Sequence, residues 1–199
     1  MGKSLEQRVA ELEKQMQKIT GDKAIHISKN LGIGDTFELA GLTWKILDIT
    51  DKGYMCLADR LEESMEFDSD SNDWRSSDLR KYLNGDFLGE LSEAIGEYNI
   101  IPFQRDLFSL DGQTEYGICE DRVSLLTVDE YRKYRKLIPN TDNYWWWLIT
   151  PWSTPCNGYK TSVTVVSSSG NGGYSCGDCD GGGVRPVCIF SSAIFESEE

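Results

Sequence analysis

The sequence predicts an α+β fold, formed by one compact domain with a short helix in front of it. Short runs of hydrophobic residues, separated by turn residues, begin at Ile25 and are typical of β-strands. Segments with helix-capping residues and helical hydrophobic spacing lie between these runs. The chain has 199 residues and no internal repeat, so it suits one ordinary domain with an appendage.

The first 21 residues predict an oligomerising coiled-coil helix. Apolar residues recur there with spacings of 4, 3, 4 and 3, the a/d pattern of two heptads. A helix this short is marginal alone and needs packing partners. We therefore expect a parallel homo-oligomer, with a trimer favoured, and a domain that spans residues 22–199. The heptad positions are Leu5, Val9, Leu12, Met16 and Ile19.

The first half of the domain predicts a β-meander followed by two short helices. The Asp-Lys-Gly turn at residues 51–53 separates two hydrophobic runs, as in a hairpin. Ser76 or Ser77 is placed to cap a helix that presents Leu79 and Leu83 on one side. The expected strands lie at residues 36–39, 43–49 and 54–58, and the second helix lies at residues 88–97.

The second half predicts one more helix and a final strand. A strand stops at Thr127, and Glu130 follows three residues later. This spacing is a capping box, which predicts a helix that runs to about Leu137. Residues 183–190 form the expected last strand of the same sheet.

Four tryptophans near residue 150 are interpreted mainly as core residues, because aromatic side chains in strands usually fill a core. Strand alternation places Trp145 and Trp147 on one face and Trp146 on the other. The fourth is Trp152, and an exposed aromatic platform for sugars is the alternative interpretation.

The charge balance argues against two classes of partner. Lys and Arg number 20 against 33 Asp and Glu, a net charge of −13 that opposes binding to nucleic acid and to anionic membranes. The N-terminus lacks the apolar stretch of a secretory signal, and no apolar run is long enough to span a bilayer. We expect no nucleic acid, no membrane insertion, and synthesis in the cytoplasm without a signal peptide.

The segment from Ser167 to Gly183 is the most informative part of the sequence. It contains only Ser, Gly, Asn, Tyr, Cys and Asp, a composition that cannot form a core. Loops longer than about 12–15 residues inside compact domains are usually functional or disordered. Tyr with Ser, Gly and Asn is also the mixture used by antibody-type binding sites. A ligand-contacting loop is therefore favoured over an inert one.

The cysteines predict neither a metal site nor a disulfide framework. Without an export signal, the expected state of all six is the reduced thiol. Cys176 and Cys179 have the spacing of zinc and redox sites, but zinc needs a second pair or histidines, and His26 is the only histidine. We expect no metal, no cofactor and no catalytic triad. The cysteines expected to lie in the core are Cys56, Cys119 and Cys188.

Several stretches resemble variable proteins of diversity-generating retroelements, which occur in bacteria and their phages. The resemblance covers most of residues 25–190, although Ile149-Thr150 stands where that family usually has Arg-Ser. It implies a C-type-lectin-like domain with a C-terminal variable region at about residues 154–183. The stretches are WRSSDLRKYLN at 74–84, LLTVDEY at 125–131, YWWWLITP at 144–151 and GVRP at 183–186.

In that family, adenine-directed mutagenesis acts mainly on Asn codons, and such changes yield Asp, Ser, Gly, Tyr or Cys. The resemblance therefore predicts a non-enzymatic receptor-binding protein on a phage tail or a bacterial surface, with a phage virion favoured. Its partner would be a protein or glycan on a cell surface. An enzyme of the formylglycine-generating type and a purely structural virion protein are the alternatives. The expected ligand-contacting residues are Asn157, Gly158, Tyr159, Ser162, Ser167, Ser169, Asn171, Tyr174, Ser175, Cys176, Asp178, Cys179 and Asp180.

Overall fold

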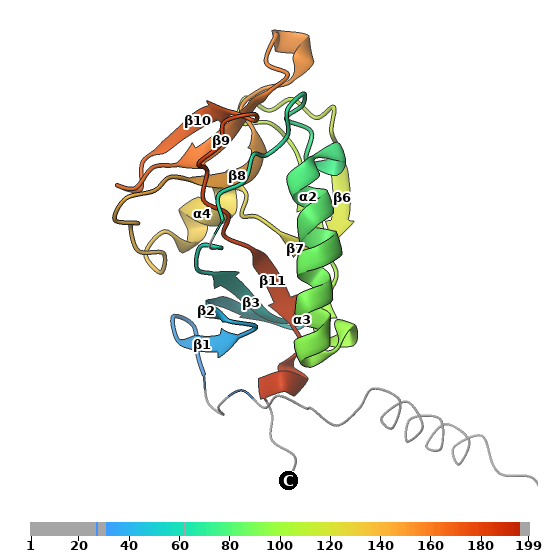
Figure 1. Ribbon diagram of the computed structural model, residues 1–199, viewed down its shortest axis with the longest axis vertical. Helices are drawn as coiled ribbons and strands as arrows, with labels where there is room; N and C mark the ends of the chain where they lie inside the picture. The colour runs from blue at the N-terminus through green and yellow to red at the C-terminus, as the bar shows by residue number, and fades with distance from the viewer. Residues whose placement is uncertain (1–26, 28–30, 62, 196–199) are drawn as a thin grey trace, which may run out of the picture.

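The computed structural model describes residue 27 and residues 31–61 and 63–195 (Figure 1). The predicted coiled-coil helix at residues 1–21 lies outside these residues. The α+β prediction is confirmed, because three antiparallel sheets combine with short helices. None of the helices in the described ranges is both long enough and apolar enough to cross a membrane.

The largest sheet has six strands arranged around β11 (Val187–Phe190), whose four residues are all buried. The strand order is β1–β2–β3–β11–β4, and β7 also pairs with β11. The predicted meander is thus confirmed, and the predicted final strand is confirmed over residues 187–190, whereas residues 183–186 lie outside it. The other bounds are β1 Thr36–Leu39, β2 Leu42–Thr50, β3 Gly53–Ala58, β4 Ile100–Ile101 and β7 Val123–Ser124.

A column of helical turns runs along one side of this sheet (Figure 1). It consists of α2 (Asp78–Tyr82), a π-helical turn (Leu83–Phe87) and α3 (Leu88–Ile95). The Ser77 hydroxyl accepts a hydrogen bond from the Arg80 N–H, so the predicted cap is confirmed. The column packs one apolar side into the core, formed by Leu79, Leu83, Phe87, Leu91 and Ile95.

A second, three-stranded sheet has the order β10–β9–β8, with β8 at Trp146–Pro151, β9 at Ser162–Val166 and β10 at Gly172–Cys176. The predicted capping box of Thr127 and Glu130 opens α4 (Val128–Tyr134). This helix ends at Tyr134 rather than near Leu137, because the Leu137 N–H bonds to the carbonyl of Tyr134 and tightens the chain into a turn. A two-stranded sheet joins β5 (Phe103–Asp106) to β6 (Ile118–Asp121).

The hydrophobic core has two parts, and the tryptophans divide between them as alternation along β8 predicts. Trp147 belongs to the larger cluster, and Trp145 packs edge to face against it at 4.7 Å between ring centroids. Trp146 belongs to the smaller cluster beside α4 and contacts Tyr131. The core interpretation is correct for Trp146 and Trp147, which are at most 1% exposed.

Candidate functional site

The segment predicted as one long loop is in large part a β-hairpin. β10 pairs with β9 from Gly172 opposite Val166 to Cys176 opposite Ser162. The loop prediction for residues 167–183 is therefore wrong at its centre. β10 has no apolar core residue of its own, and the burial that stabilises the hairpin comes from the valines of β9. The framework interpretation of Val163, Val165 and Val166 is confirmed.

An aromatic pair stands on one face of this sheet. The rings of Trp152 and Tyr174 lie 4.4 Å apart between centroids, and Tyr174 is 54% exposed. Tyr174 pairs with Thr164, and directly opposed residues of antiparallel strands share a face. We call the surface formed by Trp152 and Tyr174 the outer face; Thr164 shares this face but is itself buried. Trp152 is partly exposed, which corrects its assignment to the core.

Residues 155–160 form an exposed loop beside the end of β10, and a buried amide holds its two ends. The side-chain nitrogen of Asn72 donates to the carbonyls of Ser153, Tyr159 and Ser162 at 2.8–3.0 Å. Its side-chain oxygen accepts a bond of 2.7 Å from the Tyr116 hydroxyl. Asn72 is fully buried, so this network fixes the loop from beneath while Tyr159 remains 44% exposed.

A carboxylate holds the same loop from the side. Asp111 accepts hydrogen bonds from Ser109, Ser153 and Asn157. The Ser109 and Ser153 bonds are the main causes that lower the pKa of Asp111 to about 2. The next acidic residue, Glu115, accepts a bond from the Cys156 thiol, which lowers the pKa of Glu115. Asn157, predicted to contact ligand, is thus oriented by Asp111 and is itself exposed.

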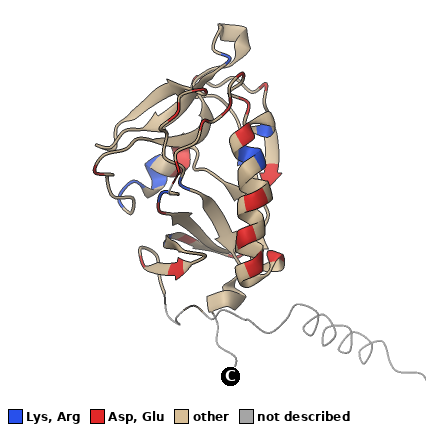
Figure 2. Cartoon of the chain, in the orientation of Figure 1, with Lys and Arg blue, Asp and Glu red and all other residues tan. Residues whose placement is uncertain are grey.

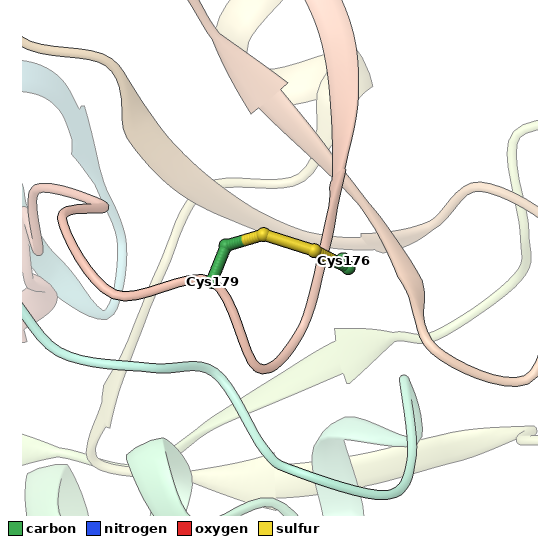
Figure 3. The surroundings of a disulfide bond; sticks show 2 residues. All are labelled: Cys176 and Cys179. Carbon is green, nitrogen blue, oxygen red and sulfur yellow. A yellow bond between two sulfur atoms is a disulfide. The ribbon is translucent and has the colours of Figure 1, made fainter.

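Cys176 and Cys179 form a disulfide with an S–S distance of 2.06 Å (Figure 3). The expectation that all cysteines are reduced thiols is therefore wrong for this pair. It took no account of how close the turn brings the two sulfurs. The bond closes a four-residue turn that begins at Cys176, the last residue of β10; we call it the CGDC turn. Asp178 lies within reach of both sulfurs, but sulfurs bonded to each other are not thiolate ligands.

Three cysteines were predicted to be small core residues. Cys56 and Cys188 are fully buried, and burial raises the pKa of both thiols well above the usual value. Cys119 is only partly buried, which corrects its assignment. Burial is still the main cause that raises its pKa to about 11.

Some glycines of the predicted variable region are required by packing. A Cβ at Gly177 would lie 2.6 Å from the backbone oxygen of Asp68, and one at Gly182 would lie 2.2 Å from Nε1 of Trp147. Gly170 combines a φ of +81° with a close approach to Arg135. By contrast, a Cβ at Gly172 meets nothing within 4 Å. The segment therefore mixes structural positions with open ones.

The structure places the thirteen predicted contact residues in strands β9 and β10, in the turns at the two ends of β10 and in the 155–160 loop. Tyr174 lies at the centre of the outer face, and Ser175 points to the opposite face, toward the core valines. Ser162 is partly buried, and its carbonyl is occupied by Asn72 and by the Trp152 N–H. The remaining residues lie in the 155–160 loop (Asn157, Gly158, Tyr159), the 167–171 turn (Ser167, Ser169, Asn171) and the CGDC turn with the residue after it (Cys176, Asp178, Cys179, Asp180).

The two turns lie at opposite ends of β10. The Gly177 N–H donates to Thr161, which places the CGDC turn beside the end of the 155–160 loop. The 167–171 turn packs against α4, where the Tyr131 hydroxyl donates to the carbonyl of Gly170. The predicted residues therefore form a strip along β10 with one loop at its end, not a single compact pocket.

Two cavities within the described residues lie elsewhere. One of about 430 Å³ is lined by α4 and the chain after β5, and includes Arg105, Glu130 and Thr150. The other, of about 470 Å³, lies beside α2 and includes Arg80 and Arg122. Neither is lined by a residue predicted to contact ligand.

No family model, no curated protein and no solved structure matches the chain.

Proposed function

We propose that the chain is a ligand-binding protein whose contact surface is the outer face together with the 155–160 loop and the CGDC turn. The pair formed by the exposed Tyr174 and the partly exposed Trp152 carries this proposal. Large aromatic side chains supply most of the binding energy in many interfaces, and the two rings of this pair are already in contact, 4.4 Å apart between centroids, before any ligand arrives. Tyr159 adds a third aromatic side chain on a loop that Asn72 and Asp111 hold in place.

We also propose a fold family and a protein class for the domain that carries this surface. We infer a C-type-lectin-like domain and a variable protein of the diversity-generating retroelement type, on the strength of the sequence stretches that resemble that family. Two features support this inference. The residues obtainable from altered Asn codons occupy the exposed strip along β10, and the apolar residues beneath them belong to a separate, buried framework. A receptor on a cell surface, reached from a phage virion, is the partner that this class of protein implies.

Truncating the aromatic pair is expected to abolish most ligand binding. The full chain and its Trp152→Ala and Tyr174→Ala variants would be compared on arrays of bacterial surface proteins and glycans, then by titration with any ligand recovered. Each variant should weaken binding by about tenfold or more, because central aromatic side chains commonly contribute over 1.4 kcal/mol.

Tyr98→Ala is the matched control. Tyr98 is 67% exposed and lies just after α3, away from the outer face. Its loss should leave binding unchanged. The proposal is wrong if Tyr98→Ala weakens binding as much as Tyr174→Ala, or if neither outer-face variant differs from the wild type.

A further inference from the structure

The outward edge of β10 has the features of a docking site for another strand. In an antiparallel pair, hydrogen-bonded and non-hydrogen-bonded residue pairs alternate. Ser167 bonds to Asn171 at one end of the hairpin, and Gly177 bonds to Thr161 at the other. With the register between them unbroken, the bonded positions of β10 are Gly173 and Ser175.

The intervening residues of β10 therefore direct their backbone groups away from β9. These groups are the N–H groups of Gly172, Tyr174 and Cys176 and the carbonyls of Gly172 and Tyr174. Within residues 31–61 and 63–195, no hydrogen bond to any of them is found; the carbonyl of Cys176 is occupied by the N–H of Cys179. Figure 1 shows β10 at the outer side of its sheet.

This edge lacks the devices by which proteins usually protect edge strands. Such devices are charged residues, Pro, bulges and very short strands. β10 contains no charged residue and no Pro, and its pairing with β9 has no register shift. Other edges in the described chain differ: β1 carries Glu38, and β4 has two residues.

We propose that the ligand pairs with β10 as an added β-strand, and that this ligand is an extended, cationic segment of a partner protein. This inference rests on the proposed function and specifies the partner. Donors and acceptors on alternate residues, about 6.8 Å apart, match the repeat of an extended polypeptide and give affinity through main-chain bonds. A partner side chain on the same face would then meet Tyr174 and Trp152.

The charges around β10 indicate that the partner segment is positively charged. Asp178 and Asp180 are exposed just beyond β10, and Asp111 and Glu115 lie beside the neighbouring loop. Figure 2 shows acidic residues on the chain segments around this end of the sheet, with Lys160 on the 155–160 loop beside them, whereas α4 carries acidic and basic residues in equal number. A second copy of this chain would bring another net charge of −13, so a basic partner is favoured over self-pairing.

The test uses random peptides displayed on phage, selected against the full chain, and then synthesised. The recovered peptides should be rich in Lys and Arg. Tyr174→Pro removes one outward N–H, at a kind of position where edge strands tolerate Pro, and Tyr174→Ala removes the same side chain but keeps the N–H. Peptide affinity should be about tenfold weaker for Tyr174→Pro than for Tyr174→Ala.

Amide hydrogen exchange gives an independent readout and a check on folding. In the free chain and in both variants, Ser175 should be protected by its bond to β9. In the wild type, the amides of Tyr174 and Cys176 should exchange freely and become protected when peptide binds.

The inference is overturned if no peptide is recovered above background, or if Tyr174→Pro and Tyr174→Ala bind peptide with equal affinity. It is also overturned if sedimentation shows that the wild-type chain forms a dimer and that Tyr174→Pro does not. Suppose that Tyr174→Ala and Trp152→Ala weaken peptide binding, and that Tyr174→Pro weakens it no further than Tyr174→Ala does. The outer face then remains the binding surface, and only the proposal of strand pairing fails. If neither side chain matters, the proposed function fails as well.

Discussion

Replacing Asn72 by Asp is expected to destabilise the domain by about 3 kcal/mol or more. Asp has nearly the same shape but cannot supply the two N–H donors that now serve the carbonyls of Ser153, Tyr159 and Ser162. Each buried group left without a partner costs about 1–3 kcal/mol, and the site is fully buried. The measurement is urea denaturation of the full chain at fixed protein concentration.

The loss of stability caused by Asn72→Asp should also depend on pH. Burial raises the pKa of a carboxyl group, so the new Asp would be more easily accommodated when protonated. Its penalty relative to the wild type should therefore be smallest below the unfolded pKa of about 4 and grow as the pH rises to neutrality. Asn143→Asp is the matched control, because Asn143 is exposed; a comparable loss there would show that the hydrogen-bond network is not the cause.

The second large effect is expected from a single methyl group at residue 177. Gly177→Ala would place Cβ 2.6 Å from the backbone oxygen of Asp68 and 3.3 Å from that of Thr161. Neither atom can move alone, because Gly177 is bonded through its own backbone to Thr161, Phe67 and Asp68. Overpacking of this kind costs about 1–3 kcal/mol. Thermal and urea denaturation should both show the loss.

Gly172→Ala, five residues away in the same Gly-rich segment, provides the comparison. Its Cβ would meet no atom within 4 Å. Its stability should change by less than about 0.5 kcal/mol, as for most surface substitutions. Equal effects at both positions would contradict the division of this segment into structural and open sites.

The sequence predicted secondary structure correctly where the residues that determine an element lie close together in the chain. Ser77 caps α2, and the Thr127–Glu130 capping box opens α4, because both devices involve residues within three positions of each other. The alternation of Trp146 and Trp147 also followed from strand geometry alone. The overall α+β class was predictable for the same reason.

The hairpin formed by β9 and β10 could not be predicted in this way. Glycine is disfavoured in strands, and Gly172–Cys176 has no hydrophobic run. β10 forms because a strand of valines lies beside it and the turn at 167–171 is closed by the bond between Ser167 and Asn171. Composition alone therefore predicted an irregular loop where tertiary pairing gives a strand.

The residues that hold the candidate site in place could not be predicted from sequence patterns either. Asn72 contacts residues 81 to 90 positions away, and nothing in its neighbourhood distinguishes it from other polar turn residues. Trp152 was assigned to the core with its neighbours, although the chain leaves β8 just before it. Composition therefore pointed to the segment proposed to contact ligand, but it gave no signal for the residues that hold this segment in place.

The central claim is that a diversified, ligand-contacting strip is displayed on a fixed framework. Long-read sequencing of the encoding locus from related genomes tests it most directly. Substitutions should fall at exposed positions such as Asn157, Tyr159, Tyr174 and Asp178, at adenines of a nearby near-repeat, and should spare Gly177 and Asn72. Fixed codons throughout residues 154–183 with no repeat nearby, or substitutions spread equally over exposed and framework positions, would contradict the claim.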